Sequence, residues 1–287
     1  MDTIKETYEK RGYLKEGFRV FRLSDAALSP IPFHYHDFHK ILVFLSGNVD
    51  YTIEGRTWTL SPRDLVFVRA GEIHRPKPEA GVPYERIVIY VSPAFFEQYK
   101  RGTEDLSLCF EGPVSDAVVH LAPGKTHDLL FHLEKLEQTT HAEGFANPLY
   151  VEMLFVEFLI LLNRAMLKSE LDPLTPVLHD EKIQEVLRTI NTHLTEQLSI
   201  DDLAAKVFLS RSHLMHTFKE ATGCSLRQYI TSKRLLKARI MLLNSPDETL
   251  ESIAWASGFK GYLPFFRAFK SEFNQTPQEW KEENLPK

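Results

Sequence analysis

Two stretches in the C-terminal half combine cationic, hydrogen-bonding and apolar side chains at helical spacing. Arginine, serine and histidine can hydrogen-bond to base edges in the major groove, and apolar side chains can contact thymine methyl groups. Lysine and serine can bind the flanking phosphates. The candidate base contacts are Arg211, Ser212, Met215, His216, Tyr262, Leu263, Phe266 and Arg267, and the candidate phosphate contacts are Ser210, Lys219, Lys233, Lys237, Lys260 and Lys270. These residue types predict binding to double-stranded DNA.

The two stretches belong to an internal repeat with an offset of 50 to 51 residues. Each copy begins with a large apolar residue followed by alanine, continues with two apolar positions four residues apart, and ends at a residue that tolerates the left-handed conformation. The matching positions are Leu203-Ala204 with Ile253-Ala254, Leu214 with Phe265, Phe218-Lys219 with Phe269-Lys270, and Gly223 with Asn274.

Each copy therefore predicts a helix-turn-helix, with motifs over about 200–222 and 250–273. Gly258 suits a positive φ in the second turn, whereas Phe208, at the equivalent place, is expected to pack instead. Residues 225–243 predict one connecting helix with a basic face formed by Arg227, Lys233, Arg234 and Lys237. Such a helix can hold both recognition helices on one side, where successive major grooves lie about 34 Å apart. The alternative is a helical module whose repeat serves packing alone.

Charge is distributed unevenly along the chain. The formal net charge is −5, but residues 203–270 hold 11 Lys and Arg against four acids, while residues 1–177 hold 19 against 25. A basic module joined to an acidic one indicates a polyanion-binding part and a part with another role.

Length and composition limit the class of protein. A chain of 287 residues with 43% hydrophobic and 25% charged residues predicts two globular domains. Cys109 and Cys224 alone cannot build a disulfide framework, so a reducing compartment fits. The polar N-terminus lacks a signal peptide, and charges within the apolar run 150–167 favour a buried helix over a membrane span. We expect a cytoplasmic protein.

The N-terminal half predicts a mainly-β domain. Short β-rich segments over about 17–91 are separated by turn residues without helical crossovers, which favours an antiparallel sandwich or small barrel. Residues 92–168 predict helices, and the helix over 147–167 is apolar on more than one face, which favours dimerisation. Residues 169–176 predict a linker, so the expected domains are 1–168 and 177–287.

Residues 199–283 resemble the DNA-binding module of the AraC/XylS family of bacterial transcription regulators. The resemblance is carried by the closing stretch SIAWASGFKGYLPFFRAFKSEFNQTPQEW, which is long and gapless. It implies two helix-turn-helix subdomains joined by one helix. Leu263-Pro264 and Gly261 depart from the family pattern. Pro264 is tolerable only in a first helical turn, and the apolar second recognition face leaves Arg267 as its main hydrogen-bonding contact.

The N-terminal half resembles, less specifically, the cupin-type sensing domain of the same family through His34-x-His36, Gly47, Pro62 and Gly71-x-x-His74. The resemblance implies a small-molecule effector pocket, although its aromatics also fit a filled core. The candidate pocket residues are His34, Tyr35, His36, Phe44, Tyr51, Trp58 and His74.

In metal-binding cupins the matching histidines and a glutamate form a metal site. Here Lys40 occupies the glutamate position, and His39 is the nearby stand-in. Because a cation repels a metal ion, we expect no cofactor, with His34, His36 and His74 as the alternative metal set.

The sequence thus predicts a two-domain, non-enzymatic, ligand-responsive transcription regulator. It should bind DNA and a small-molecule effector, form a homodimer, avoid membranes and contact RNA polymerase if it is an activator. A cupin enzyme such as a dioxygenase is the alternative, but it leaves the DNA-binding module unexplained. A regulator whose first domain only dimerises is the third possibility.

Overall fold

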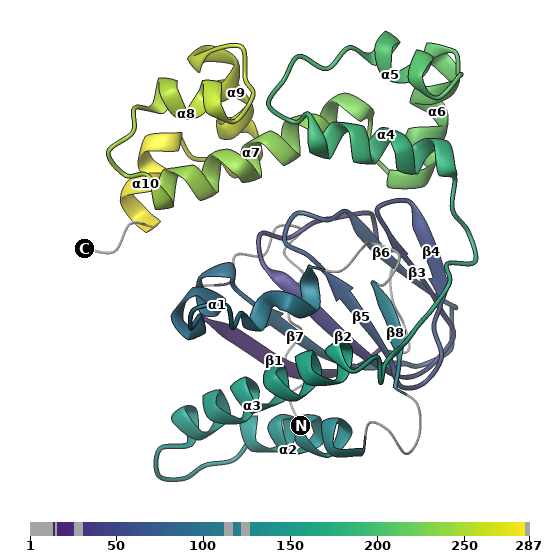
Figure 1. Ribbon diagram of the computed structural model, residues 1–287, viewed down its shortest axis with the longest axis vertical. Helices are drawn as coiled ribbons and strands as arrows, with labels where there is room; N and C mark the ends of the chain where they lie inside the picture. The colour runs from purple at the N-terminus through teal and green to yellow at the C-terminus, as the bar shows by residue number, and fades with distance from the viewer. Residues whose placement is uncertain (1–13, 15, 26–30, 112–116, 122–126, 285–287) are drawn as a thin grey trace. The chain divides into compact units, whose positions relative to one another are not determined.

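The computed structural model describes residues 14, 16–25, 31–111, 117–121 and 127–284. The chain divides into two compact units, Met1–His179 and Asp180–Lys287. The first unit is rich in β-strands with flanking helices, and the second is helical (Figure 1). The predicted fold class, a mainly-β cupin-like domain followed by an all-α domain, is confirmed.

The strands of the first unit pair antiparallel in two sheets. The larger has the order β1 (Phe18–Asp25), β7 (Tyr84–Val91), β2 (His39–Ser46), β5 (Asp64–Val68), β8 (Val118–His120) and β9 (Asp172–Pro173), and the smaller has the order β4 (Arg56–Thr59), β3 (Val49–Ile53) and β6 (His74–Pro78). Pairing among the described residues leaves the two sheets open, so that of the two predicted forms, sandwich or small barrel, the closed barrel is not seen in this pairing.

Alternation along the central strands creates two cores, because successive side chains point to opposite faces of a sheet. Ile41 and Val43 of β2 belong to a core shared with the helices. Leu42 and Phe44 belong to a second core that includes Tyr51 from the smaller sheet. The central strands are therefore apolar on both faces.

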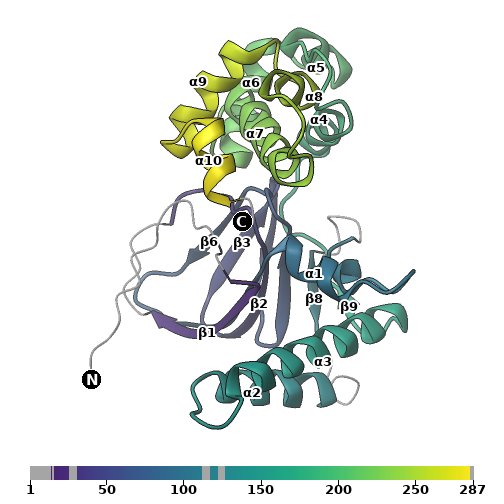
Figure 2. The same cartoon turned by 90° about the vertical axis from the view of Figure 1, so that its left-hand side faces the viewer.

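Helices cover the outer face of the larger sheet. They are α1 (Pro93–Tyr99), the 3-10 helix η1 (Leu106–Phe110), α2 (His127–Thr140) and α3 (Asn147–Leu167). Ser92 caps α1 by accepting a hydrogen bond from the Phe95 amide, as its Ser-Pro sequence predicts. Figures 1 and 2 show α2 and α3 side by side along this sheet, and Phe155 and Phe158 of α3 are fully buried there.

The segment predicted as a linker differs from that expectation, because it lies on the first unit. Residues 171–178, here called the strap, contribute β9, which pairs with β8. The Trp58 indole donates to the Leu174 carbonyl at 2.8 Å, and Thr57 forms a β-bridge with Leu178. Backbone pairing of this kind is not visible in local composition.

The second unit contains α4 (Glu181–Thr192), α5 (Ile200–Lys206), α6 (Arg211–Thr222), α7 (Leu226–Asn244), α8 (Leu250–Ala256), α9 (Tyr262–Phe273) and α10 (Pro277–Asn284). The helix pairs α5–α6 and α8–α9 are the two predicted repeats. No helix of the described ranges has the length and apolar character needed to cross a membrane.

Candidate nucleic-acid interface and histidine cluster

The two helix-turn-helix copies are built on equivalent buried residues. Leu214 and Phe218 of α6 are fully buried, as are Phe265 and Phe269 of α9. Ala204 and Ala254 lie buried where α5 and α8 meet these helices, because a small side chain lets two helices approach closely. Gly223 and Asn274 end α6 and α9 with φ of 75° and 55°. The predicted repeat and both helix ends are confirmed.

On α6 the predicted contact residues Arg211, Ser212, Met215 and His216 are all exposed. The Arg211 guanidinium is 2.7 Å from the Asp201 carboxylate on α5, and the His216 ring is 3.4 Å from Glu220. Both contacts lie at the surface, where ion pairs such as Arg211–Asp201 contribute little stability. Arg211 and His216 can therefore leave these carboxylates for a base or a phosphate with little loss of stability.

The exposed face of α9 is more apolar than that of α6. Leu263 and Arg267 are exposed, whereas Tyr262 and Phe266 are half-buried, with their rings 5.7 Å apart. Within the described ranges, the Arg267 side chain forms no hydrogen bond or ion pair. Gly261 precedes the helix without a side-chain cap, and Pro264 falls in the first turn, where a missing amide hydrogen does no harm.

The turn of the first copy contradicts the expectation that Phe208 packs. Phe208 has a φ of 56° and is 90% exposed. The two turns therefore share the left-handed conformation, and the helix geometry outweighs the preference of phenylalanine. Gly258 has a φ of 95°, and a Cβ atom there would lie 2.8 Å from the Leu194 carbonyl oxygen and the Thr195 Cα atom.

The predicted phosphate-binding side chains occupy different environments. Lys219, Lys260 and Lys270 are exposed, as is Ser210, whose hydroxyl accepts from the His213 amide as the cap of α6. Lys233 and Lys237 on α7 are half-buried, and the Lys233 ammonium lies 5.1 Å from the centre of the Tyr229 ring.

Arg234 does not belong to the basic face of α7 in the way the sequence suggests. Its guanidinium donates to the carbonyl oxygens of Leu194 and Glu196 at 2.9 and 2.7 Å. Burial lowers the pKa of Arg234 from its usual value. Arg234 therefore holds the chain before α5 against α7, and Gly258 packs at the same point.

In the first unit, the structure brings His34, His36 and His74 together. The three rings have centroids 4.3 to 5.1 Å apart. His34 and His74 exchange backbone hydrogen bonds of 3.1 and 2.9 Å, which places their side chains next to each other. His36, two residues from His34 in extended chain, points to the same side.

Burial determines the protonation of this cluster. It lowers the pKa of His34 to about 4 and of His36 to about 2, and it also lowers that of His74; the charge of Lys40 acts in the same direction. The three imidazoles are therefore neutral at physiological pH. Burial, with the nearby charge of Arg86, lowers the pKa of Lys40 to about 7.

Of the other predicted pocket residues, Tyr51 contacts this cluster. Tyr51 stacks on His74 with centroids 6.1 Å apart, and its hydroxyl accepts from the Lys40 ammonium at 3.0 Å. Phe44 and Trp58 are buried in the packed core between the sheets, and Tyr35 is half-buried.

Lys40 and His39 point to opposite faces of β2. The His39 ring lies 4.5 Å from Phe110 on the helix side, so it cannot stand in as a fourth ligand. Lys40 is a member of the site that our prediction of the pocket omitted. The sequence could have revealed this, because side chains alternate between the faces of a strand. Lys40 therefore points to the same face of β2 as Leu42 and Phe44, which face the smaller sheet.

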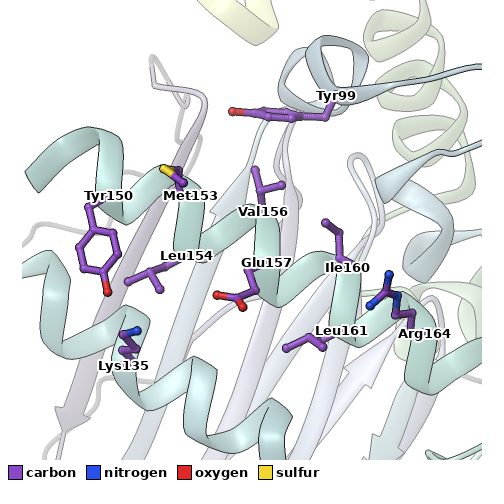
Figure 3. Close-up of a pocket in the computed structure, with 10 residues that line it drawn as sticks. All are labelled: Tyr99, Lys135, Tyr150, Met153, Leu154, Val156, Glu157, Ile160, Leu161 and Arg164. Carbon is purple, nitrogen blue, oxygen red and sulfur yellow. The ribbon is translucent and has the colours of Figure 1, made fainter. Parts of the chain in front are cut away.

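A groove of about 550 Å³ runs along the outer side of α3 (Figure 3). Tyr150 and Met153 line it and are 43% and 61% exposed, and Lys135 of α2 lies 5.5 Å from the Tyr150 ring. Helix α3 thus buries one apolar side in its own unit and leaves another at the surface. The second face predicted from the sequence is present.

Known proteins match both units. A family model described as an AraC-like ligand binding domain matches residues 24–159, and one described as a helix-turn-helix domain matches residues 203–283. The chain is 28% identical to the HTH-type transcriptional activator RhaS of Enterobacter sp. (strain 638) and 25% identical to that of Klebsiella pneumoniae (strain 342). These alignments cover 90% and 88% of this chain and 89% and 87% of the relatives.

Two solved structures also align with this chain. ToxT from Vibrio cholerae aligns over 93% of this chain and 97% of its own at 15% identity, with a TM-score of 0.39. The DNA-binding domain of AdpA, solved in complex with a target DNA, covers 35% of this chain and 89% of its own at 26% identity, with a TM-score of 0.34. The two family models account for about three quarters of the chain. With its AraC-like ligand-binding domain and helix-turn-helix domain in this order, the chain belongs to the AraC/XylS family of transcription regulators.

Proposed function

We propose that this protein is a sequence-specific activator of transcription that responds to a small-molecule effector bound in its first unit, and that it is not an enzyme. The name of the RhaS relatives, transcriptional activator, supports activation. RNA polymerase is then a partner, and the chain works beside DNA in the cytoplasm.

The observation that carries the proposal is the repetition of one exposed recognition face, on α6 and on α9, above equivalent buried cores. Helix α7 joins the two copies and has 19 residues, a length of about 28 Å. This length approaches the spacing of about 34 Å between successive major grooves on one side of DNA. One chain can therefore contact two adjacent grooves.

The two recognition helices contribute differently to sequence choice. Arg211, Ser212 and His216 offer α6 several hydrogen-bonding groups for base edges. On α9, Arg267 is the main donor, with Leu263 positioned for apolar contact or for reading DNA shape. Lys219, Lys237 and Lys270 supply phosphate contacts, which contribute affinity without sequence information.

The protein acts as a homodimer through α3. The surface around the groove includes exposed Leu149, Tyr150 and Met153, and the equivalent helix of a second copy presents the same apolar side. Exposed apolar side chains gathered on one helix mark an interaction site. Dimers also place two copies of the DNA-binding unit on one operator.

The effector acts through the first unit's own core. Tyr51, next to His74, pairs across β3 and β4 with Trp58, and Trp58 holds the strap at Leu174. The strap leads directly into the second unit. A small molecule that moves Tyr51 therefore weakens or strengthens the attachment of the strap. Through the strap, it changes how freely the DNA-binding unit can move.

The effector can be found by measuring operator affinity of the intact dimer in the presence of fractionated small-molecule extracts. We expect at least one fraction to change the affinity, and Trp58→Phe, which removes the strap's hydrogen bond, to reduce that change. Equal affinity with every fraction, in a protein that still binds its operator, contradicts effector control.

A further inference from the structure

We propose that His34, His36 and His74 bind a divalent transition-metal ion of the zinc class through three imidazole nitrogens. One donor atom from each residue lies within 4.8 Å of the others. This inference concerns the first unit alone and does not depend on DNA binding or on effector control.

The backbone fixes the three side chains before any ion arrives. The paired hydrogen bonds between His34 and His74 hold the start of β6 against the chain before β2. The Gly71 amide donates to the His36 carbonyl oxygen at 2.7 Å. Rings on both sides restrain the imidazoles, since His36 stacks on Phe38 at 4.6 Å and His74 on Tyr51.

Hydrogen bonds to backbone carbonyl groups determine which ring nitrogen of His74 and of His34 is protonated. His74 Nδ1 lies 3.0 Å from the Glu72 carbonyl oxygen, and His34 Nδ1 lies 2.8 Å from that of Pro32. A carbonyl can only accept, so each Nδ1 carries the hydrogen and each Nε2 carries a free electron pair. Such outer contacts are the usual arrangement of metal-binding histidines.

Two of the rings hold buried nitrogens that the protein leaves unsatisfied. Among the described residues, His74 Nε2 and both ring nitrogens of His36 have no hydrogen-bond partner. His74 is fully buried, and His36 is 6% exposed. Buried polar atoms normally have a partner, and a metal ion would satisfy these nitrogens together.

The spacing fits an ion of this class. Zinc binds histidine nitrogen at about 2.0–2.1 Å, which puts tetrahedral donors about 3.4 Å apart. The donor atoms lie within 4.8 Å of one another, so only small movements of the imidazole rings would bring them to this separation. Three imidazoles with no carboxylate suit zinc, copper, iron or nickel and disfavour magnesium and calcium, which prefer oxygen. The protein donors leave a fourth position for water or an oxygen-bearing molecule.

The decisive experiment is metal titration of the full-length protein, purified without a polyhistidine tag and stripped with a chelator. We expect one equivalent of Zn²⁺ to bind and raise Tm, no comparable effect of Mg²⁺, and a visible spectrum of nitrogen-coordinated Co²⁺. His36→Asn and His74→Asn should each weaken Zn²⁺ binding by more than about 100-fold, beyond the loss from an outer-contact change.

His141→Gln is the matched control, because His141 is exposed on the surface of the same unit; it should bind Zn²⁺ like the unaltered protein. Absence of stoichiometric binding to the folded, unaltered protein overturns the proposal, as does Zn²⁺ binding that both His36→Asn and His74→Asn leave unchanged. If either variant fails to fold, the Co²⁺ spectrum of the unaltered protein decides between nitrogen coordination and none.

Discussion

At the scale of single residues, we propose that base recognition by α9 depends on Arg267, an exposed cation of that helix. Arg267→Ala should reduce affinity for the cognate operator by roughly 1–3 kcal/mol and relax the base preference at one position. Lys237→Ala should instead weaken binding to all sequences alike and lower the salt dependence, because a phosphate contact carries no base information. Quantitative binding to cognate and scrambled DNA separates the two effects. An equal loss on scrambled DNA for Arg267→Ala contradicts its role as a base contact.

Lys40 carries the charge from which the sequence predicted that no metal binds, so it should weaken the metal binding that we propose for the histidine cluster. It is buried and its charge opposes positive charge on the three imidazoles. Lys40→Met keeps an unbranched apolar side chain and removes the ammonium. Because repulsion falls with the charge, we expect Zn²⁺ to bind severalfold more tightly at neutral pH, as measured by competition with a coloured chelator. Weaker binding in a folded variant contradicts this electrostatic account.

Part of the geometry of these sites could be predicted from the sequence, and the contacts assigned to the residues stay predictions. The exposed faces of α6 and α9 follow from helical periodicity, and the histidines were found through a family resemblance. Including Lys40 in the site required the alternation of side chains along β2 as well. Arg234 could not be assigned from its charge, since only the fold reveals that the Leu194 and Glu196 carbonyls accept its hydrogens.

At the scale of elements, the two helix-turn-helix turns adopt one conformation with different residues. Asparagine tolerates positive φ better than phenylalanine, so Phe208→Asn should stabilise the second unit by up to about 1 kcal/mol. The same change at the equivalent Gly258 should destabilise it by about 1–3 kcal/mol, because its Cβ meets backbone atoms. Urea unfolding of the two variants measures both effects. Equal effects of the two substitutions contradict the packing argument.

Helix α3 is the element on which the proposed dimer depends. Met153→Glu places a charge on its exposed apolar side and should shift the protein from dimer to monomer without unfolding it. Ile240→Glu alters an equally exposed residue of α7 and should leave the dimer intact. Sedimentation at several concentrations distinguishes these outcomes. A dimer that survives Met153→Glu shows that another surface is used.

Elements with strong local patterns were predicted, and those formed by distant pairing were not. Helices α1 and α3 follow from the Ser92-Pro93 cap and the continuous apolar run. Strand β6 contains Pro76 and Pro78, which argue against a strand, yet it lies at the edge of the smaller sheet, where proline is tolerated. Strand β9 consists of two residues and, among the strands of the described ranges, pairs with β8 alone.

At the scale of the whole molecule, charge separates the two units as the sequence predicts. The second unit concentrates cations around its recognition helices, while the first is acidic. The linker was predicted from its prolines, but the strap belongs to the first unit and the chain divides after His179. That difference bears on the proposed effector control, which uses a segment held by Trp58 in place of a free linker.

Selection of bound fragments from a genomic DNA library by the full-length protein, at two salt concentrations, tests the central claim most directly. We predict enrichment of a site with two fixed blocks about one helical turn apart, since the proposed function places α6 and α9 in successive major grooves. Affinity should fall steeply as salt rises, because lysine and arginine release counterions from phosphates. No enriched sequence, even with small-molecule cell extract present, contradicts the account.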